Sequence, residues 1–214
     1  MRFDTVLIAN RGEIAVRIIR ACREQNLGCV SVYSTADRDA LHVKFADRAV
    51  CIGAPATADS YLRMDSIIEA CRQTGATAVH PGFGFLSENA EFAKLCREND
   101  ITFIGPSPEC IAMLGDKAQA KETMKAAGVP VIPGSEGALH SIEEAKEIAK
   151  KIGYPVLVKA SAGGGGRGIR RVDSEEQLEE QLHVAQEEAK KFFGDDTVYL
   201  EKLIFGPHHV EVQI

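Results

Sequence analysis

The sequence predicts an α/β protein in two parts, a mostly parallel sheet followed by a smaller unit built around a glycine-rich hairpin. Three observations support this fold class. Short apolar strands alternate with helical patterns in residues 1–114, and a segment rich in Pro and Gly then interrupts the alternation. Beyond it the order of elements changes to strand, glycine loop and strand.

The first part contains apolar, β-branched runs separated by amphipathic stretches. We expect strands at Thr5–Ala9, Cys29–Tyr33, Ala49–Ile52, Thr77–His80 and Ile101–Ile104, and helices at Glu13–Gln25, Asp65–Arg72 and Glu88–Glu98. Such alternation forms βαβ units and a parallel sheet, whose ligand-binding loops follow the carboxyl ends of the strands. Two of these ends read IANRGE and VHPGFGFLSEN.

A change of character follows near residue 115. Pro108 opens a short helix that Gly115 closes, and Asp116 is placed to cap a second helix that runs to Ala127. The next ten residues, GVPVIPGSEG, hold two prolines and three glycines, which is typical of a linker.

The second part has its own sequence of elements. Ser141 with Glu144, and Ser174 with Gln177, have the spacing of capping boxes at two helix starts. Strands are expected at Val156–Lys159, Ile169–Val172 and Val198–Glu201, with a final strand beginning at His209–Ile214. The helix after Ser174 places one apolar face toward the core, formed by Leu178, Leu182, Ala185, Ala189 and Phe192.

Composition excludes several classes of function. The 25 Lys and Arg residues are interleaved with 31 Asp and Glu, for a net charge of −6, so no basic patch for nucleic acid is evident. None of the six cysteines forms a C-x-x-C pair, which indicates reduced thiols, a cytoplasmic location and no structural zinc. No stretch approaches the ~20 apolar residues that span a bilayer, so no membrane role is expected.

The run GGGGRG at residues 163–168 raises the main functional question. It matches G-x-G-x-x-G only formally, because IRRV, a strand, follows it instead of a helix, and it lacks the G-K-[ST] ending of a P-loop. A glycine-rich hairpin of this kind allows backbone N–H groups to approach phosphate oxygens, and Lys159 adds a point charge at its start. The alternative is a disordered surface loop beside a solvated lysine.

Several motifs together resemble a known family. IANRGEIAVRIIRA, HPGFGFLSENAEFA, FIGPSPECIAMLGDK, KASAGGGGRG and EKLIFGPHHVEVQ occur in this order and resemble biotin carboxylase, the ATP-grasp component of biotin-dependent carboxylases such as acetyl-CoA carboxylase and pyruvate carboxylase. The resemblance covers the chain from Val6 onward. It implies a Rossmann-like preATP-grasp domain at 1–114, a helical linker at 115–131, an ATP-grasp lid at 132–204 and the first strand of a truncated C-terminal subdomain at 205–214.

The resemblance also implies a chemistry. ATP and bicarbonate form carboxyphosphate, whose CO2 passes to N1′ of biotin on a carrier protein, a step that feeds fatty acid biosynthesis when the final acceptor is acetyl-CoA. The implied cofactors are ATP and Mg2+, with biotin as the carrier-bound substrate. The implied partners are a biotin carboxyl carrier protein or domain, a carboxyltransferase, and a second copy of the chain bound through residues 1–114, where Arg17, Arg20 and Glu24 lie on one helix.

Site residues are carried over position by position. Lys117 and Lys159 match lysines that contact ATP phosphates, and Gly165 and Gly166 match loop positions whose N–H groups meet phosphate. The backbone of Glu201, Lys202, Leu203 and Ile204 matches the hinge that reads the adenine edge, and His209 matches a histidine near the nucleotide. The local sequence alone allows a simpler interpretation, in which Lys117 is an exposed residue in a helix and His209 is a histidine at the end of a strand.

Departures from the family limit what the chain is expected to do alone. Ala162 replaces a loop glycine, Phe83 stands where tyrosine is common, and His208 stands where an arginine usually precedes the histidine. The family's metal ligands, bicarbonate-binding residues and catalytic arginine are expected beyond Ile214, so the resemblance assigns no catalytic residue and no metal ligand here. The isolated chain is accordingly expected to be inactive in turnover.

Alternative functions remain open at this point. The chain could act only as an interaction module that pairs through its first domain. It could also belong to another ATP-grasp ligase, such as a carbamoyl-phosphate synthetase or a glycinamide ligase, although RGEIA with HPGFGFLSEN argues against this. A dehydrogenase is disfavoured because NRG offers one glycine, although Asp37 does follow the second strand.

Overall fold

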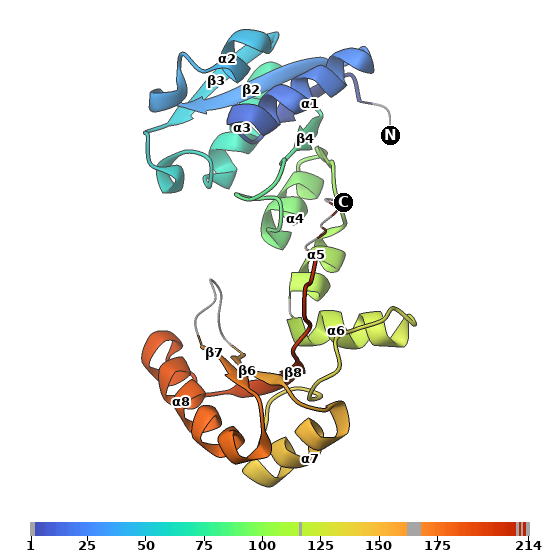
Figure 1. Cartoon of the computed structure of the whole chain (residues 1–214). Helices are drawn as coiled ribbons and strands as arrows, with labels where there is room; N and C mark the ends of the chain where they lie inside the picture. The colour runs from blue at the N-terminus through green and yellow to red at the C-terminus, as the bar shows by residue number, and fades with distance from the viewer. Residues whose placement is uncertain (1–2, 116, 162–167, 209, 211, 213–214) are drawn as a thin grey trace. The chain divides into compact units, whose positions relative to one another are not determined.

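The computed structural model describes residues 3–115, 117–161, 168–208, 210 and 212. The chain divides into two compact units, of which the first is built on Met1–Asp116 and the second on Lys117–Val210 (Figure 1). The expected final strand at His209–Ile214 and most of the glycine loop lie outside the described residues.

The first unit contains one parallel sheet. Its strands are β1 (Thr5–Ile8), β2 (Gly28–Ser34), β3 (Arg48–Gly53), β4 (Ala78–His80) and β5 (Thr102–Phe103), in the order β3-β2-β1-β4-β5. Every neighbouring pair is parallel, with Val6 opposite Cys29 on one side and Ala78 on the other. The predicted α/β class with a parallel sheet is therefore confirmed.

Helices connect these strands. They are α1 (Gly12–Glu24), α2 (Leu41–Phe45), α3 (Met64–Thr74), α4 (Ala90–Glu98) and α5 (Pro108–Gly115), with single 3-10 turns at Thr35–Asp37 and Thr57–Asp59. The sequence pattern missed α2, because five residues are too few to show a helical period.

Helices cover both faces of this sheet, as the alternation along β1 shows. Val6 and Ile8 are buried in a cluster with Ile18 and Ile19 of α1. Leu7 belongs to a second cluster, on the face covered by α3 and α4 (Figure 1). A strand buried on both faces reads as a continuous apolar run, which is why TVLIA lacks polar alternation.

The second unit combines a small antiparallel sheet with helices. Its elements are α6 (Lys117–Ala126), α7 (Ile142–Ile152), β6 (Val156–Ala160), β7 (Ile169–Val172), α8 (Glu175–Phe193) and β8 (Val198–Lys202). The strand order is β7-β6-β8, with Lys159 opposite Ile169 in one pair and Tyr199 in the other. The glycine run thus joins two antiparallel strands, as the strand–loop–strand prediction requires.

One face of this sheet carries the core. Val156 and Val158 of β6, with Val198 and Leu200 of β8, pack against α7 and α8. The expected apolar face of α8 is confirmed for its first four members, which are buried, whereas Phe192 was wrongly included, since its side chain is 50% exposed. The opposite face presents Leu157, Lys159, Tyr199 and Glu201, all only partly buried.

A loop segment completes the outer edge of β8. Gly134 forms a bridge with Glu201, the N–H of Ser135 donates to the Leu200 carbonyl (2.9 Å), and the N–H of Lys202 donates to the Pro133 carbonyl (2.8 Å). A Cβ at Gly134 would lie 2.2 Å from the Leu200 oxygen, so this approach requires glycine.

Both predicted capping boxes are only partly formed. Ser141 caps α7 by accepting from the N–H of Glu144 (3.1 Å), but the Glu144 carboxylate accepts from the N–H of His140 instead of that of Ser141. Ser174 makes no capping hydrogen bond, and Gln177 accepts from the N–H of Asp173. In both helices the reciprocal bond reaches one residue further back than the motif specifies.

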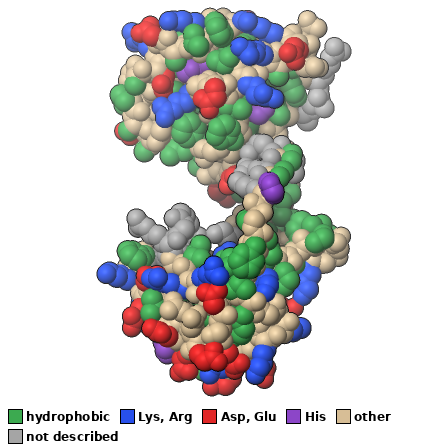
Figure 2. Space-filling model, viewed as in Figure 1, with side chains coloured by type: hydrophobic (Ala, Val, Ile, Leu, Met, Phe, Trp, Pro, Cys, Tyr) green, Lys and Arg blue, Asp and Glu red, His purple; other side chains and the backbone are tan. Residues whose placement is uncertain are grey.

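The structure also places the charged side chains and the cysteines. On the face seen in Figure 2, Lys and Arg side chains lie among Asp and Glu in each unit. Cys22, Cys29, Cys71 and Cys96 are free and buried, whereas Cys51 is free and exposed. Of the helices in the described part of the chain, none is both long and apolar enough to cross a membrane.

Candidate functional site

The outer face of the small sheet holds a closely paired lysine and glutamate. Lys159 Nζ donates to Glu201 Oε2 at 2.6 Å, and the two side chains are 25% and 13% exposed. Lys159 lies opposite Tyr199 and Glu201 opposite Leu157, so the pair is a diagonal contact between neighbouring antiparallel strands. The site is therefore positioned by strand register.

A second lysine approaches the same carboxylate. Lys121, on α6, places Nζ 3.7 Å from Glu201 Oε1, and its side chain is 28% exposed. Two ammonium groups thus surround one carboxylate, which leaves a local excess of positive charge. A partly buried cluster of this kind favours an anionic ligand.

The glycine loop follows β6, which ends at Ala160, one residue after Lys159. The N–H of Ala160 donates to the Gly168 carbonyl at 2.9 Å, which closes the base of the hairpin, and Gly168 adopts φ +67°. Gly165 and Gly166 lie outside the described residues. Lys159 thus lies at the entrance to the loop that is predicted from the sequence to bind phosphate groups.

The hinge segment has backbone groups that are already engaged. Besides the bond from Lys202 to Pro133, the N–H of Leu203 donates to the Pro155 carbonyl (3.2 Å). The Lys202 ammonium donates to the carbonyls of Gly153 (2.8 Å) and Tyr154 (3.0 Å) at the C-terminal end of α7. The Lys202 side chain therefore holds α7 against β8, where a cation also complements the helix dipole.

The remaining predicted site residues are distributed as follows. Ile204 is 46% exposed just beyond β8. Lys117 is the first residue of α6, but its side chain lies outside what is described, as does His209. Among the predicted residues that the structure describes, Lys159 and Glu201 are in contact through their side chains. Residues 202–204 are near Glu201 because they follow it directly in the sequence.

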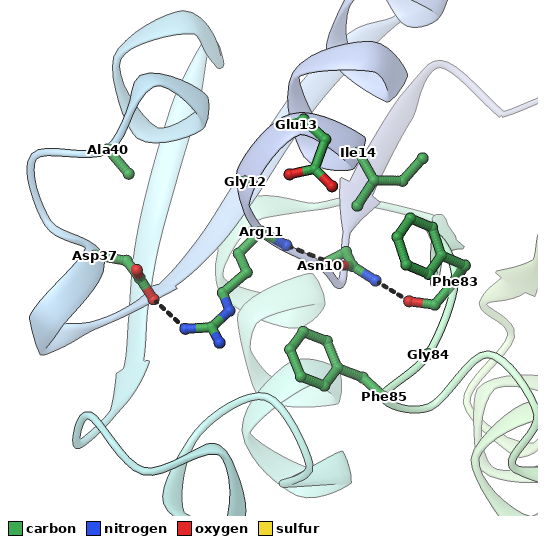
Figure 3. Close-up of a pocket in the computed structure, with 10 residues that line it drawn as sticks. All are labelled: Asn10, Arg11, Gly12, Glu13, Ile14, Asp37, Ala40, Phe83, Gly84 and Phe85. Atoms are coloured by element: carbon green, nitrogen blue, oxygen red, sulfur yellow. Dashed lines mark hydrogen bonds and ion pairs between the residues drawn. The ribbon is translucent and has the colours of Figure 1, made fainter. Parts of the chain in front are cut away.

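A separate pocket opens in the first unit, at the carboxyl ends of the strands. Its volume is about 410 Å³, and it is lined by residues of the loops after β1, β2 and β4, with Arg11, Asp37 and Phe83 among them (Figure 3). The loop after β1 enters α1 on one face of the sheet and the loop after β4 leads to α4 on the other. Ligands of open α/β sheets bind at such a switch point.

Asn10 ties these two loops together. Its Nδ2 donates to the carbonyls of Pro81 (2.7 Å) and Phe83 (2.9 Å), and its Oδ1 accepts from the N–H of Arg11 (2.9 Å). Gly82 has φ +68°, and a Cβ there would lie 2.7 Å from Asn10 Nδ2. The first glycine of HPGFGF, Gly82, is thus required by its close contact with Asn10.

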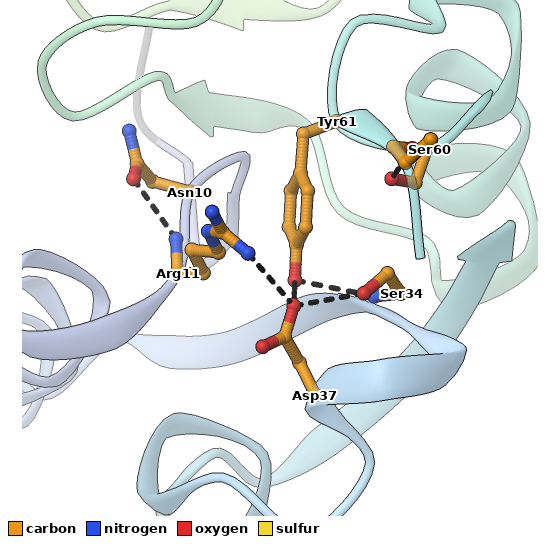
Figure 4. A network of polar contacts seen from close by, with 7 residues as sticks. Asn10, Arg11, Ser34, Asp37, Ser60 and Tyr61 are labelled. Carbon is orange, nitrogen blue, oxygen red and sulfur yellow. Dashed lines mark hydrogen bonds and ion pairs between the residues drawn. The ribbon is translucent and has the colours of Figure 1, made fainter. Parts of the chain in front are cut away.

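Asp37 organises the polar wall of the pocket. One of its oxygens, Oδ2, accepts from Tyr61 Oη (2.6 Å) and Ser34 Oγ (2.8 Å) and lies 3.5 Å from Arg11 (Figure 4). Burial favours a raised pKa for Asp37, but the hydrogen bonds from Tyr61 and Ser34 and the Arg11 charge outweigh it and lower the pKa below 3.8. This carboxylate is engaged by the protein itself, which counts against the ribose-binding role of the dehydrogenase alternative.

Arg11 is held over two aromatic rings. Tyr61 and Phe85 stack with centroids 5.1 Å apart, and the guanidinium carbon lies 5.4 Å and 5.7 Å from these centroids. Phe83, 53% exposed, forms an apolar edge of the same pocket. A small ligand with a negative group and an apolar edge would be complementary to this arrangement.

Among the residues that the structure describes, no three His, Cys, Asp or Glu side chains lie close enough together to hold a metal ion.

Sequence reasoning missed Lys121, Arg11 and Asn10. Lys121 follows Lys117 by four residues, one helical turn, and this spacing was a usable signal. Arg11 and Asn10 stand inside the quoted IANRGE motif, but their partners come from residues 34–85 and only the fold brings these together.

Comparisons with known proteins match both units. Residues 2–111 match the family "Biotin carboxylase, N-terminal domain", and residues 116–214 match "Carbamoyl-phosphate synthase L chain, ATP binding domain". Biotin carboxylase of Nostoc sp. is 56% identical over 214 residues, which are 100% of this chain and 48% of that protein. The chain thus spans about half the length of the curated relatives it matches.

Solved structures give the same result. The biotin carboxylase domain dimer of Hydrogenobacter thermophilus 2-oxoglutarate carboxylase, in complex with MgADP, ADP and bicarbonate, has a TM-score of 0.78 and 53% identity over 96% of this chain and 45% of that chain. A Campylobacter jejuni biotin carboxylase–β,γ-ATP complex has a TM-score of 0.82 and 50% identity over 96% of this chain and 46% of that chain.

The resemblance read from the motifs is confirmed by these matches. The second unit matches an ATP-binding domain of carbamoyl-phosphate synthase, which agrees with the ATP-binding role implied by the resemblance. The match of residues 2–111 to the N-terminal domain of biotin carboxylase favours this family over the other ATP-grasp ligases. The chain belongs to the biotin carboxylase family.

Proposed function

We propose that this protein takes part in the ATP-dependent carboxylation of biotin, with its second unit binding the nucleotide. The observation that supports the proposal most directly is the cluster of Lys159, Glu201 and Lys121 at the entrance to the glycine-rich hairpin. Relatives that contain matching segments are named biotin carboxylases, and two of the matched structures hold ADP or an ATP analogue.

In this proposal Lys159 binds the polyphosphate. To do so, its ammonium exchanges Glu201 for an oxygen of the polyphosphate, which as a whole carries more negative charge than one carboxylate and equally accepts hydrogen bonds. The N–H groups of Gly165 and Gly166 would contact further oxygens, and Lys117 and His209 would lie near the nucleotide. The excess positive charge would also stabilise the charge that develops as the phosphoryl group moves to bicarbonate.

The adenine would be read by backbone groups of the segment from Glu201 to Ile204. Because the N–H groups of Lys202 and Leu203 are engaged by Pro133 and Pro155, the recognition falls to the other backbone groups of this segment. The partly exposed Ile204 side chain would contribute an apolar surface beside the base.

Carboxyphosphate is the proposed intermediate, and carrier-bound biotin the proposed acceptor. Mg2+ would shield the triphosphate. The residues that the structure describes contain no cluster able to hold a metal ion, so none of them is assigned as a Mg2+ ligand. The biotin carrier and a carboxyltransferase are the proposed partners in the complete reaction.

The nucleotide assignment is tested by titrating ATP into the chain and into Lys159→Gln in a calorimeter. We expect ATP binding by the chain and a loss of about 10- to 100-fold in affinity for the variant, because one charge-assisted hydrogen bond contributes roughly 1.5–3 kcal/mol. Lys125→Gln is the matched control, since Lys125 lies on α6 with its side chain 62% exposed.

The chemistry is tested with a chimera in which these 214 residues replace the matching half of the Nostoc enzyme. Bicarbonate-dependent ATP cleavage with free biotin is the expected activity, reduced by Lys159→Gln. The proposal fails if the chain binds no ATP and the chimera cleaves none.

A second copy of the chain is the proposed partner of the first unit, because the H. thermophilus relative is a dimer. Arg17, Arg20 and Glu24 are exposed along α1. Beside them is a hollow of about 550 Å³ whose lining includes Leu41, 60% exposed. A charged helix face next to an exposed apolar side chain is suited to a protein interface.

A further inference from the structure

The carboxylate of Glu201 is shared unequally between two lysines. Its Oε2 accepts a short hydrogen bond from Lys159, 2.6 Å, whereas its Oε1 lies 3.7 Å from Lys121 Nζ, beyond hydrogen-bond distance. All three side chains are largely screened from solvent, with 13–28% exposed. One carboxylate thus faces two ammonium groups, and one of these ammonium groups is incompletely paired.

Lys121 is the member of this cluster whose ammonium group lacks a hydrogen-bond partner among the described residues. Its Nζ is also buried. An ammonium group has three N–H donors, and leaving them unpaired away from water is costly. Shortening the distance to Glu201 Oε1 by about 1 Å would convert the contact into a charge-assisted hydrogen bond.

We propose that Lys121 is a positioning residue that takes over the Glu201 carboxylate when Lys159 turns to the polyphosphate of a nucleotide. The inference rests on the proposed nucleotide binding by Lys159. Without Lys121, the departure of Lys159 would leave the Glu201 carboxylate, only 13% exposed, without a positively charged partner. Breaking a buried ion pair in this way is strongly unfavourable. With Lys121, the carboxylate stays paired, and the free energy cost of releasing Lys159 is reduced.

Two other roles for Lys121 make different predictions. If Lys121 only anchored α6 to the sheet, its removal would weaken the fold and would affect nucleoside and nucleotide binding alike. If Lys121 contacted a phosphate directly, its removal would weaken ATP binding whether or not Glu201 carried a charge. The exchange mechanism alone requires both the phosphates and the Glu201 carboxylate.

The first test compares Lys121→Met, Lys121→Arg and the unaltered chain, with ATP and adenosine as separate probes in titration calorimetry. We expect ATP to bind about 10-fold more weakly to Lys121→Met, while the affinity for adenosine is unchanged, because adenosine does not draw Lys159 away from Glu201. Lys121→Arg should retain ATP affinity. Lys125→Met, one turn further along α6, should bind ATP as the unaltered chain does, and a denaturant titration of each variant verifies that it is folded.

The second test repeats Lys121→Met in a Glu201→Gln background. A neutral amide needs no counter-charge, so the loss caused by Lys121→Met should fall to within 2-fold. A 10-fold loss that persists in this background indicates direct phosphate contact and overturns the exchange mechanism.

The remaining outcomes separate this inference from the function on which it rests. If the unaltered chain binds no ATP, the proposed function fails and this inference fails with it. If the chain binds ATP and Lys121→Met binds it equally well, or loses ATP and adenosine affinity equally, only the role of Lys121 is overturned.

Discussion

At the scale of single residues, polar groups in this protein are placed by several partners at once. Asp37 accepts from Tyr61 and Ser34 while it faces Arg11. Asn10 donates two hydrogen bonds to the loop after β4 and accepts a third from the neighbouring backbone in the loop after β1. Both residues thus join segments that are far apart in the sequence. Such residues fix the geometry of the pocket because no single neighbour could orient them.

The first residue-scale prediction concerns Asp37 and pH. Because its pKa is lowered in the folded protein, this carboxylate contributes stability that is present above its ordinary pKa of 3.8 and is lost as the pH falls through the folded value. We expect Asp37→Asn to destabilise the protein by about 1–3 kcal/mol at pH 7 and to flatten the loss of stability in acid. Denaturant titrations between pH 7 and about pH 2 measure both effects.

Asp39→Asn is the control for this prediction, since Asp39 lies two residues away and is exposed. Its stability should stay within about 0.5 kcal/mol of the unaltered chain. If Asp37→Asn is as stable as the unaltered chain at pH 7, the network has no energetic role.

At the scale of elements, close backbone contacts decide how the second unit is assembled. Residues 133–135 lie along β8 and satisfy its outer hydrogen-bonding groups, so β8 is protected on both sides. The Lys202 ammonium joins β8 to the end of α7. The strand that carries Glu201 is therefore fixed before any ligand binds.

The element-scale prediction is that Gly134→Ala destabilises the second unit by roughly 1–3 kcal/mol, the usual cost of overpacking. The added Cβ would meet the Leu200 carbonyl oxygen at 2.2 Å, so the segment must move away from β8. Hydrogen exchange should show faster exchange of the Ser135 and Lys202 amides.

Gly115→Ala serves as the comparison, because nothing lies within 4 Å of a Cβ at that position. It should be neutral or slightly stabilising. Unchanged protection of Ser135 in Gly134→Ala would show that the contact is not required.

At the scale of the whole molecule, the two units have separate cores. Among the described residues, the first unit has one hydrophobic cluster on each face of its sheet, and the second has one cluster between its sheet and the helices α7 and α8. The proposed roles follow the same division, with pairing assigned to the first unit and nucleotide binding to the second.

The whole-molecule prediction is that the chain forms a homodimer through α1. Arg20→Glu reverses a charge on the exposed face of this helix and should convert the dimer to a monomer in light scattering at concentrations of about 10 µM. Arg72→Glu is the control, since Arg72 lies on α3, on the opposite face of the sheet. A strictly monomeric unaltered chain, or a dimer that survives Arg20→Glu, would contradict the assignment.

The fold class, the order of the principal elements and the family could all be predicted from the amino-acid sequence. Apolar periodicity reports which faces are buried, and quoted motifs such as HPGFGFLSEN and KASAGGGGRG are contiguous, so both signals are local. The sequence also marked Lys159 beside the glycine loop.

Which charged groups lie in contact could not be predicted from the sequence and became visible in the folded chain. Lys121, Lys159 and Glu201 are separated by 38 and 42 positions in the sequence and converge through the register of β6 with β8 and the placement of α6. Asp37 likewise meets Arg11 and Tyr61 only through the parallel sheet. Electrostatic contacts depend on the distance between two groups in space, and local periodicity in the sequence carries no information about that distance.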